Sequence, residues 1–216
     1  MYISIFSDEF YKDIYEVLPI IKEWGMTHVD FRAMINGKKI EDQTEEELRA
    51  LKKALDEYGL KAGVIQSSLC KVHLPGPERQ AKELERLEGI IRACEILDTK
   101  LVRSFFYWQH PQDDPHCGEL ASRPDALAEV MTMYAPIAKR AKEAGLIIGF
   151  ENCGTTPDEV ICFLEAMNVP EWGMAWDVSN MFELLPEAAG DCVDYFTKAL
   201  KYANMIHVKS RGVPTI

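Results

Sequence analysis

The sequence predicts an α/β fold, a (β/α)8 TIM barrel whose eighth βα unit is missing from the chain. Short apolar runs alternate with amphipathic helical segments along its whole length, as in a parallel sheet covered by helices. No glycine-rich nucleotide-binding motif follows the first run, which argues against the competing open, doubly wound sheet. Charged residues also interrupt predicted strands, and they are easier to place at the polar rim of a barrel than under covering helices.

The repeating unit is a helix that leads, often through a glycine, into a short strand. Thr44-Glu45-Glu46-Glu47 is a capping-box pattern, and Thr156-Pro157-Asp158-Glu159 combines an N-cap, a proline at N1 and an acidic N3. Each pattern opens a predicted helix. The strands are expected at residues 3–6, 27–31, 61–66, 100–107, 146–151, 172–177 and 205–208, and the helices near 14–24, 44–58, 77–94, 124–138, 156–167 and 187–202.

Two charged residues on these strands are expected inside the barrel. Asp30 shares a strand face with Arg32, opposite Val29 and Phe31, and Arg103 stands between Val102 and Ser104 on the fourth strand. Side chains from alternate strands share a layer in this fold. The sequence therefore predicts a buried ion pair between Asp30 and Arg103, whose loss would be costly.

Bulk properties bound the class of protein. With 216 residues and 47% hydrophobic content, the chain is most simply one domain over residues 1–216, C-terminally incomplete as a barrel. It shows no signal-peptide pattern and no apolar stretch of about 18 residues, and its six cysteines form no C-x-x-C pair. These features predict a cytoplasmic protein with reduced thiols and no membrane partner. The net charge of −11 argues against nucleic acid as a partner.

Three residues of metal-ligand type each end a predicted strand. They are Glu151 in Phe-Glu-Asn, Asp177 in Trp-Asp-Val-Ser-Asn and His207 in Ile-His-Val-Lys. Spacings of 26 and 30 residues separate them, about one strand-plus-helix unit each. In a parallel barrel they would converge at one rim and could hold a divalent cation.

Weaker candidates for substrate contact surround this set, and each has a structural alternative. Asn180 could bind a hydroxyl or cap the next helix, and Lys209, on the same strand face as His207, could neutralise a ligand anion or be a surface lysine. An aromatic cluster after the fourth strand, Tyr107, Trp108 and His110, could form the floor of a sugar pocket or pack in the core. Gln66 ends the third strand and could reach a hydroxyl.

The order Phe-Glu-Asn, Trp-Asp-x-x-Asn and Ile-His-x-Lys, with the early Gly-x-x-x-Val-Asp-Phe-Arg, resembles the xylose isomerase-like TIM barrel superfamily of sugar (phosphate) isomerases and epimerases. Members similar to this pattern include D-tagatose 3-epimerase and the inositol-catabolism isomerases. The resemblance implies one divalent metal ion (Mn, Co, Mg or Zn) on Glu151, Asp177 and His207, with Glu151 also catalytic. It implies a fourth ligand, a glutamate after strand eight, which has no counterpart because the sequence stops nine residues past His207.

The function implied is a metal-dependent isomerase or epimerase of a ketose or related sugar, working through an enediolate. A lyase of the keto-inositol dehydratase type on the same scaffold is the main alternative, followed by a non-catalytic or fragmentary barrel. An endonuclease IV-type DNA-repair enzyme would need Asp-x-x-His where the chain has Asp177-Val-Ser-Asn180, and it is disfavoured. Without an eighth unit we expect very low turnover and an exposed apolar interior, which leaves a homo-oligomer open.

Overall fold

The computed structural model describes residues 1–10, 13–32, 34–109, 118–180 and 192–209 of the 216-residue chain. The chain forms two compact units, each built from several segments. The first comprises Met1–Leu69, Gly76–Ser104 and Pro136–Ile147, and the second comprises Cys70–Pro75, Phe105–Ala135 and Ile148–Ile216. The structure describes these units separately, so the single domain expected over residues 1–216 stays a prediction.

Four parallel strands form the sheet of the first unit. They are β1 (Ser4–Phe6), β2 (His28–Phe31), β5 (Lys61–Leu69) and β6 (Leu101–Ser104), paired in that order. Only β5 is long, and seven of its nine residues are fully buried, as expected of a parallel strand covered on both faces. A short antiparallel hairpin, β3 (Met34–Ile35) with β4 (Lys38–Lys39), was not predicted.

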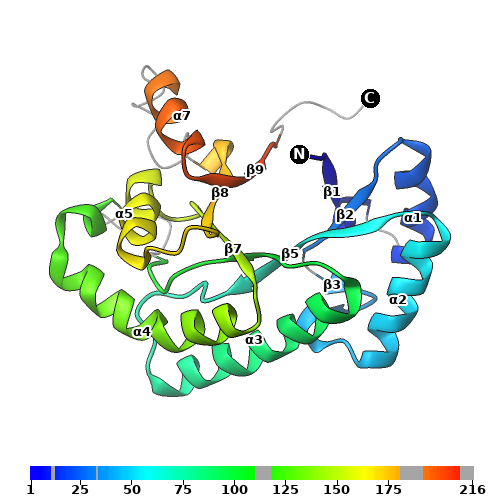
Figure 1. Ribbon diagram of the computed structural model, residues 1–216, viewed down its shortest axis with the longest axis horizontal. Helices are drawn as coiled ribbons and strands as arrows, with labels where there is room; N and C mark the ends of the chain where they lie inside the picture. Colours follow the sequence, from blue (N-terminus) through cyan, green and yellow to red (C-terminus); the bar gives the residue numbers. More distant parts are fainter. Residues whose placement is uncertain (11–12, 33, 110–117, 181–191, 210–216) are drawn as a thin grey trace. The chain divides into compact units, whose positions relative to one another are not determined.

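Three helices belong wholly to the first unit: α1 (Ile14–Glu23), α2 (Glu45–Glu57) and α3 (Pro77–Leu97). The predicted capping box at the start of α2 is confirmed, because the Thr44 side chain accepts from the Glu47 amide while the Glu47 carboxylate accepts from the Thr44 amide. One apolar stripe of α2 faces inward, and α2 packs beside α1 and α3 (Figure 1). The buried residues of that stripe are Leu48, Leu51, Ala54 and Leu55.

The ion pair expected between Asp30 and Arg103 is wrong. Asp30 accepts hydrogen bonds from Gln66 Nε2 (2.9 Å) and Val64 N (2.9 Å), and Arg103 donates to the carbonyl oxygens of Gln66 (2.8 Å) and Ser67 (2.9 Å). The reason is topological, because β5 lies between β2 and β6 and places Gln66 where the two charges would have met. Burial raises the pKa of Asp30, and its hydrogen bonds oppose that shift.

Parallel strands β7 (Ile147–Glu151), β8 (Gly173–Asp177) and β9 (Ala203–His207) supply the second unit's sheet. Helices α5 (Pro157–Met167) and α7 (Cys192–Leu200) belong to it, while α4 (Pro124–Glu143) contributes its first part here and its last part to the first unit. The predicted Thr156–Glu159 cap opens α5 as a full capping box. Gly173 is required on β8, because a Cβ there would lie 2.6 Å from the Tyr202 carbonyl oxygen.

Aromatic rings form the centre of the second unit. Phe106 stacks on Phe163 with centroids 4.6 Å apart, and Phe150 meets Phe163 edge-on at 5.0 Å. Tyr134 and Trp172 extend the cluster with further edge-on contacts. Each such pair contributes about 0.5–1.5 kcal/mol beyond its buried area, so β7 is held firmly against α5 just before Glu151.

All seven predicted strands are present in the described residues, with ends that shift by one to three residues. The largest difference is at 100–107, where β6 already stops at Ser104 and Tyr107 adopts a left-handed backbone with φ 64°. Such a φ ends a strand. The expected helix near 187–202 is seen as α7 from Cys192, and the residues before 192 lie outside the described part. Among the described helices, none is both long and apolar enough to span a membrane.

Candidate metal centre

Glu151, Asp177 and His207 are the last residues of β7, β8 and β9. Parallel pairing puts the carboxyl ends of these strands side by side, and the register aligns Asp177 with His207. All three residues are buried, with Asp177 fully enclosed. The topology therefore places two acids and an imidazole together in a site that water reaches poorly.

The three side chains converge as the sequence predicts. One ligand atom from each lies within 4.8 Å of the others, and His207 Nδ1 is 4.0 Å from Glu151 Oε2. Ligand atoms around one ion at about 2.0–2.3 Å are at most about 4.6 Å apart, so small side-chain movements suffice. Two carboxylates and an imidazole suit several divalent ions and select none strongly. The donor set therefore fits a divalent cation.

Asn152, which the sequence analysis did not single out, holds Asp177 in place. Its side-chain oxygen accepts from the Asp177 amide (2.7 Å), and its Nδ2 donates to the Asp177 carbonyl (3.0 Å). Asn152 is fully buried, so both bonds are shielded from water. The asparagine thus fastens the end of β7 to the end of β8, and the only signal for it in the sequence is its place directly after Glu151.

The two oxygens of Asp177 have different partners. Oδ1 accepts from the backbone amides of Ser179 (3.1 Å) and Asn180 (3.3 Å), which is the role of a helix N-cap. Oδ2 forms an ion pair with the ammonium group of Lys209. Asp177 thus caps the helical turn that follows β8, and the capping alternative for Asn180 stays a prediction because residues 181–191 lie outside the described part.

Asn180 and Lys209 join the cluster, and the substrate contact expected of each stays a prediction. Asn180 Nδ2 donates to Glu151 Oε1 (3.2 Å), and Lys209 Nζ donates to Asn180 Oδ1 (3.2 Å). The asparagine is buried, whereas the lysine side chain remains 31% exposed. Five side chains from the ends of three strands therefore form one connected polar group.

The aromatic candidates after β6 are packed within the second unit. Tyr107 and Trp108 are almost fully buried, and Trp108 Nε1 donates to Glu159 Oε1 (2.8 Å). Glu159, which is fully buried, also accepts from the Leu120 amide (3.2 Å). These contacts match the core-packing alternative, and substrate contact stays a prediction. His110 lies outside the described residues.

Gln66 belongs to the first unit, where it is buried and donates to Asp30. Its expected contact with a substrate hydroxyl stays a prediction. The structure explains its burial through the polar chain from Asp30 to Arg103.

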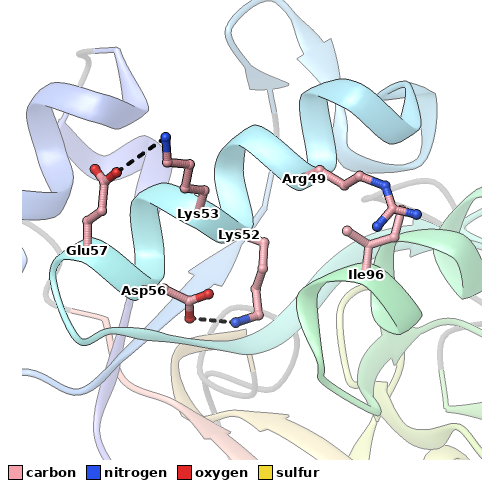
Figure 2. Close-up of a pocket in the computed structure, with 6 residues that line it drawn as sticks. All are labelled: Arg49, Lys52, Lys53, Asp56, Glu57 and Ile96. Atoms are coloured by element: carbon pink, nitrogen blue, oxygen red, sulfur yellow. Dashed lines mark hydrogen bonds and ion pairs between the residues drawn. The ribbon is translucent and has the colours of Figure 1, made fainter.

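The first unit also carries a groove of about 580 Å³ beside α2, lined by Arg49, Lys52, Lys53, Asp56, Glu57 and Ile96. Figure 2 shows that its charges pair along the helix, Lys52 with Asp56 and Lys53 with Glu57. Exposed pairs of this spacing are usual on helix surfaces. The groove lacks a convergent buried polar group, so it carries no chemistry comparable to the three strand ends.

Several solved structures are similar to the chain, all at low identity. A xylose isomerase-like TIM barrel protein from Mycobacterium smegmatis in complex with magnesium has 17% identity and a TM-score of 0.64, over 90% of this chain and 65% of that one. The probable 3-DHS dehydratase AsbF from Bacillus anthracis has 15% identity and a TM-score of 0.72, over 97% and 73%. D-psicose 3-epimerase from Clostridium cellulolyticum H10, with D-tagatose, has 13% identity and a TM-score of 0.70, over 100% and 76%.

A sequence search of curated proteins finds no match. The model of one family, described as xylose isomerase-like TIM barrel, matches residues 18–215. This match covers nearly the whole chain and agrees with the parallel strands, the covering helices and the similar structures. The expected barrel fold class is thereby confirmed, and the chain belongs to the xylose isomerase-like TIM barrel family.

Proposed function

We propose that this protein is a divalent-metal-dependent isomerase or epimerase of a ketose or a related sugar. One observation carries the proposal, the convergence of Glu151, Asp177 and His207 at the ends of three consecutive parallel strands. Membership in a family whose solved relatives include sugar epimerases supports the substrate class.

A divalent cation at this site would polarise the carbonyl of a bound hydroxy-ketone and stabilise the enediolate left after the neighbouring carbon loses its proton. Glu151 is the candidate base for that proton, because it is a buried carboxylate with two oxygens that can serve different roles. Asn180 fixes one of these oxygens by donating to Oε1. Asn152 and the two capping amides keep Asp177 from rotating away.

Burial of the cluster serves the same chemistry. A site in which a carboxylate removes a proton from carbon works best when water is kept away from that carboxylate. Glu151 is only 4% exposed. The Lys209 side chain, which pairs with Asp177, is 31% exposed, so solvent comes close to the cluster along this lysine.

The test is exchange of a carbon-bound proton in heavy water. The Mn²⁺-loaded protein would be incubated with D-fructose, D-psicose or D-tagatose, and deuterium next to the carbonyl would be followed by NMR. Glu151→Gln should slow this exchange at least about a hundredfold, as expected for a general base. Glu171→Gln, which removes an exposed acid of the same unit, is the matched control and should leave the exchange unchanged.

The reaction products distinguish this function from the lyase alternative. The similarity to a probable 3-DHS dehydratase is the reason to test that alternative. An epimer or an aldose as product supports isomerisation or epimerisation. Loss of a hydroxyl group with formation of an unsaturated ketone would identify a dehydratase. Failure of the wild-type protein to bind Mn²⁺, Co²⁺, Mg²⁺ or Zn²⁺ in calorimetric titrations would contradict both.

A further inference from the structure

Lys209 already supplies a positive charge to the candidate metal centre. Its ammonium group forms an ion pair with Asp177 Oδ2 and lies 3.2 Å from Asn180 Oδ1. The same asparagine donates to Glu151 Oε1 at 3.2 Å. One ammonium group is thus linked to both carboxylates, directly to Asp177 and through one amide to Glu151.

The two carboxylates need such a charge when no metal is bound. Asp177 is fully buried and Glu151 is 4% exposed, and two like charges in poor contact with water repel and lose solvation. Lys209 reaches them on a side chain that is 31% exposed. A long, partly exposed lysine side chain can turn away from Asp177 by rotation about its own bonds, without rearrangement of the strands.

A divalent ion and the lysine compete for the same oxygen. If both contacted Asp177 Oδ2, ligand-bond and hydrogen-bond lengths would hold them at most about 5 Å apart. Two cations at that distance in a buried site repel strongly. When Lys209 neutralises Asp177, the carboxylate therefore attracts a divalent ion less strongly, and a bound ion likewise weakens the attraction of Asp177 for Lys209.

We propose that Lys209 is a tethered counter-ion that stabilises the metal-free centre and is displaced when a divalent cation binds, so that Lys209 sets the metal affinity. This inference rests on the proposed function, because it takes Asp177 as a metal ligand. Lys209 acts here through Asp177 and is a positioning residue.

The expected effect follows from the competition. If the ion pair is formed in about nine of ten metal-free molecules, the apparent Kd for the metal is raised about tenfold over that of a site without the lysine. Lys209→Met should therefore bind Mn²⁺ about tenfold more tightly than the wild type. In EDTA the same variant should melt about 2–4 °C lower, because the two carboxylates have lost their counter-ion.

The experiment is calorimetric titration with Mn²⁺, together with thermal melts in EDTA and in excess Mn²⁺. Lys201→Met removes an equal charge from an exposed position just before β9 and is the matched control. Lys209→Gln is a second variant that keeps a donor for Asn180 without the charge. Tighter Mn²⁺ binding in both Lys209 variants, with no change in Lys201→Met, is the expected result.

Unchanged or weaker Mn²⁺ binding in both Lys209 variants would overturn the inference while leaving the proposed metal site intact. An equal gain in affinity for Lys201→Met would also overturn it, because the effect would then be one of net charge. If the wild type and all variants bind no Mn²⁺ although they melt cooperatively, the proposed metal site itself fails and the inference fails with it.

Discussion

Polar residues on the strands form a cluster in each unit of this protein, and the two clusters are built differently. In the first unit Asp30, Gln66 and Arg103 form a chain in which hydrogen-bond donors meet acceptors. In the second unit Glu151, Asp177 and His207 bring three electron-pair donors within 4.8 Å of one another. Lys209 is the one lysine or arginine among the described partners of the second cluster, and its side chain is 31% exposed.

This difference separates a structural cluster from a candidate binding centre. In the first cluster the donors and acceptors largely satisfy one another, and among these three residues only Gln66 Oε1 is a buried side-chain atom without a hydrogen-bond partner. Several ligand-type groups that face each other gain most from an added cation. Charged residues on barrel strands are therefore informative about function only when their contacts are known.

The largest effect is expected from removing the clamp on Asp177. Asn152→Ala leaves the Asp177 amide and carbonyl without their buried partner, which should lower the free energy of unfolding by about 3 kcal/mol. Because Asp177 is then less well oriented, Mn²⁺ affinity should fall about 10- to 100-fold. Urea denaturation and calorimetry measure the two effects. A destabilised variant with unchanged affinity would show that Asn152 serves the fold alone.

In the first unit, loss of buried hydrogen bonds should lower the free energy of unfolding without changing metal binding. Arg103→Met removes charged hydrogen bonds to the carbonyls of Gln66 and Ser67, and we expect a loss of about 2 kcal/mol in urea denaturation. The Mn²⁺ affinity of the folded variant should equal that of the wild type. An altered affinity would mean that the two clusters are coupled and would break the contrast between them.

The smallest effect should come from the buried acid of the first unit. Because burial raises the pKa of Asp30, its ionised form costs stability, and this cost is absent below the unfolded pKa and complete above the folded one. Asp30→Asn should therefore be more stable than the wild type near pH 7, by less than about 1 kcal/mol. The advantage should shrink as the pH falls toward 4.

The new amide can keep the local bonds, because its oxygen can accept from the Val64 amide while the Gln66 side chain turns its own oxygen toward the new NH2 group. Urea midpoints measured from pH 4 to pH 7 check this prediction. A constant difference across that range would show that Asp30 does not titrate differently in the folded state.

The alternation of strands and helices, the two capping boxes and the three ligand-type residues at strand ends could all be predicted from the sequence. These features depend on local signals, since hydrophobic period, caps and glycine stops act within a few neighbouring residues. The convergence of Glu151, Asp177 and His207 could be expected because parallel strands present their carboxyl ends at one edge. No such local signal marked the β3–β4 hairpin, whose strands have two residues each.

Which polar groups meet depends on tertiary packing. Asp30 contacts Gln66 instead of Arg103 because the intervening strand β5 supplies a nearer partner. Asn152 contacts the Asp177 backbone, and the Lys209 side chain contacts Asp177 and Asn180. These contacts depend on side-chain directions that the spacing of residues in the sequence does not predict. Long polar side chains choose among several neighbours by register and rotamer, and these are set by packing of the whole sheet.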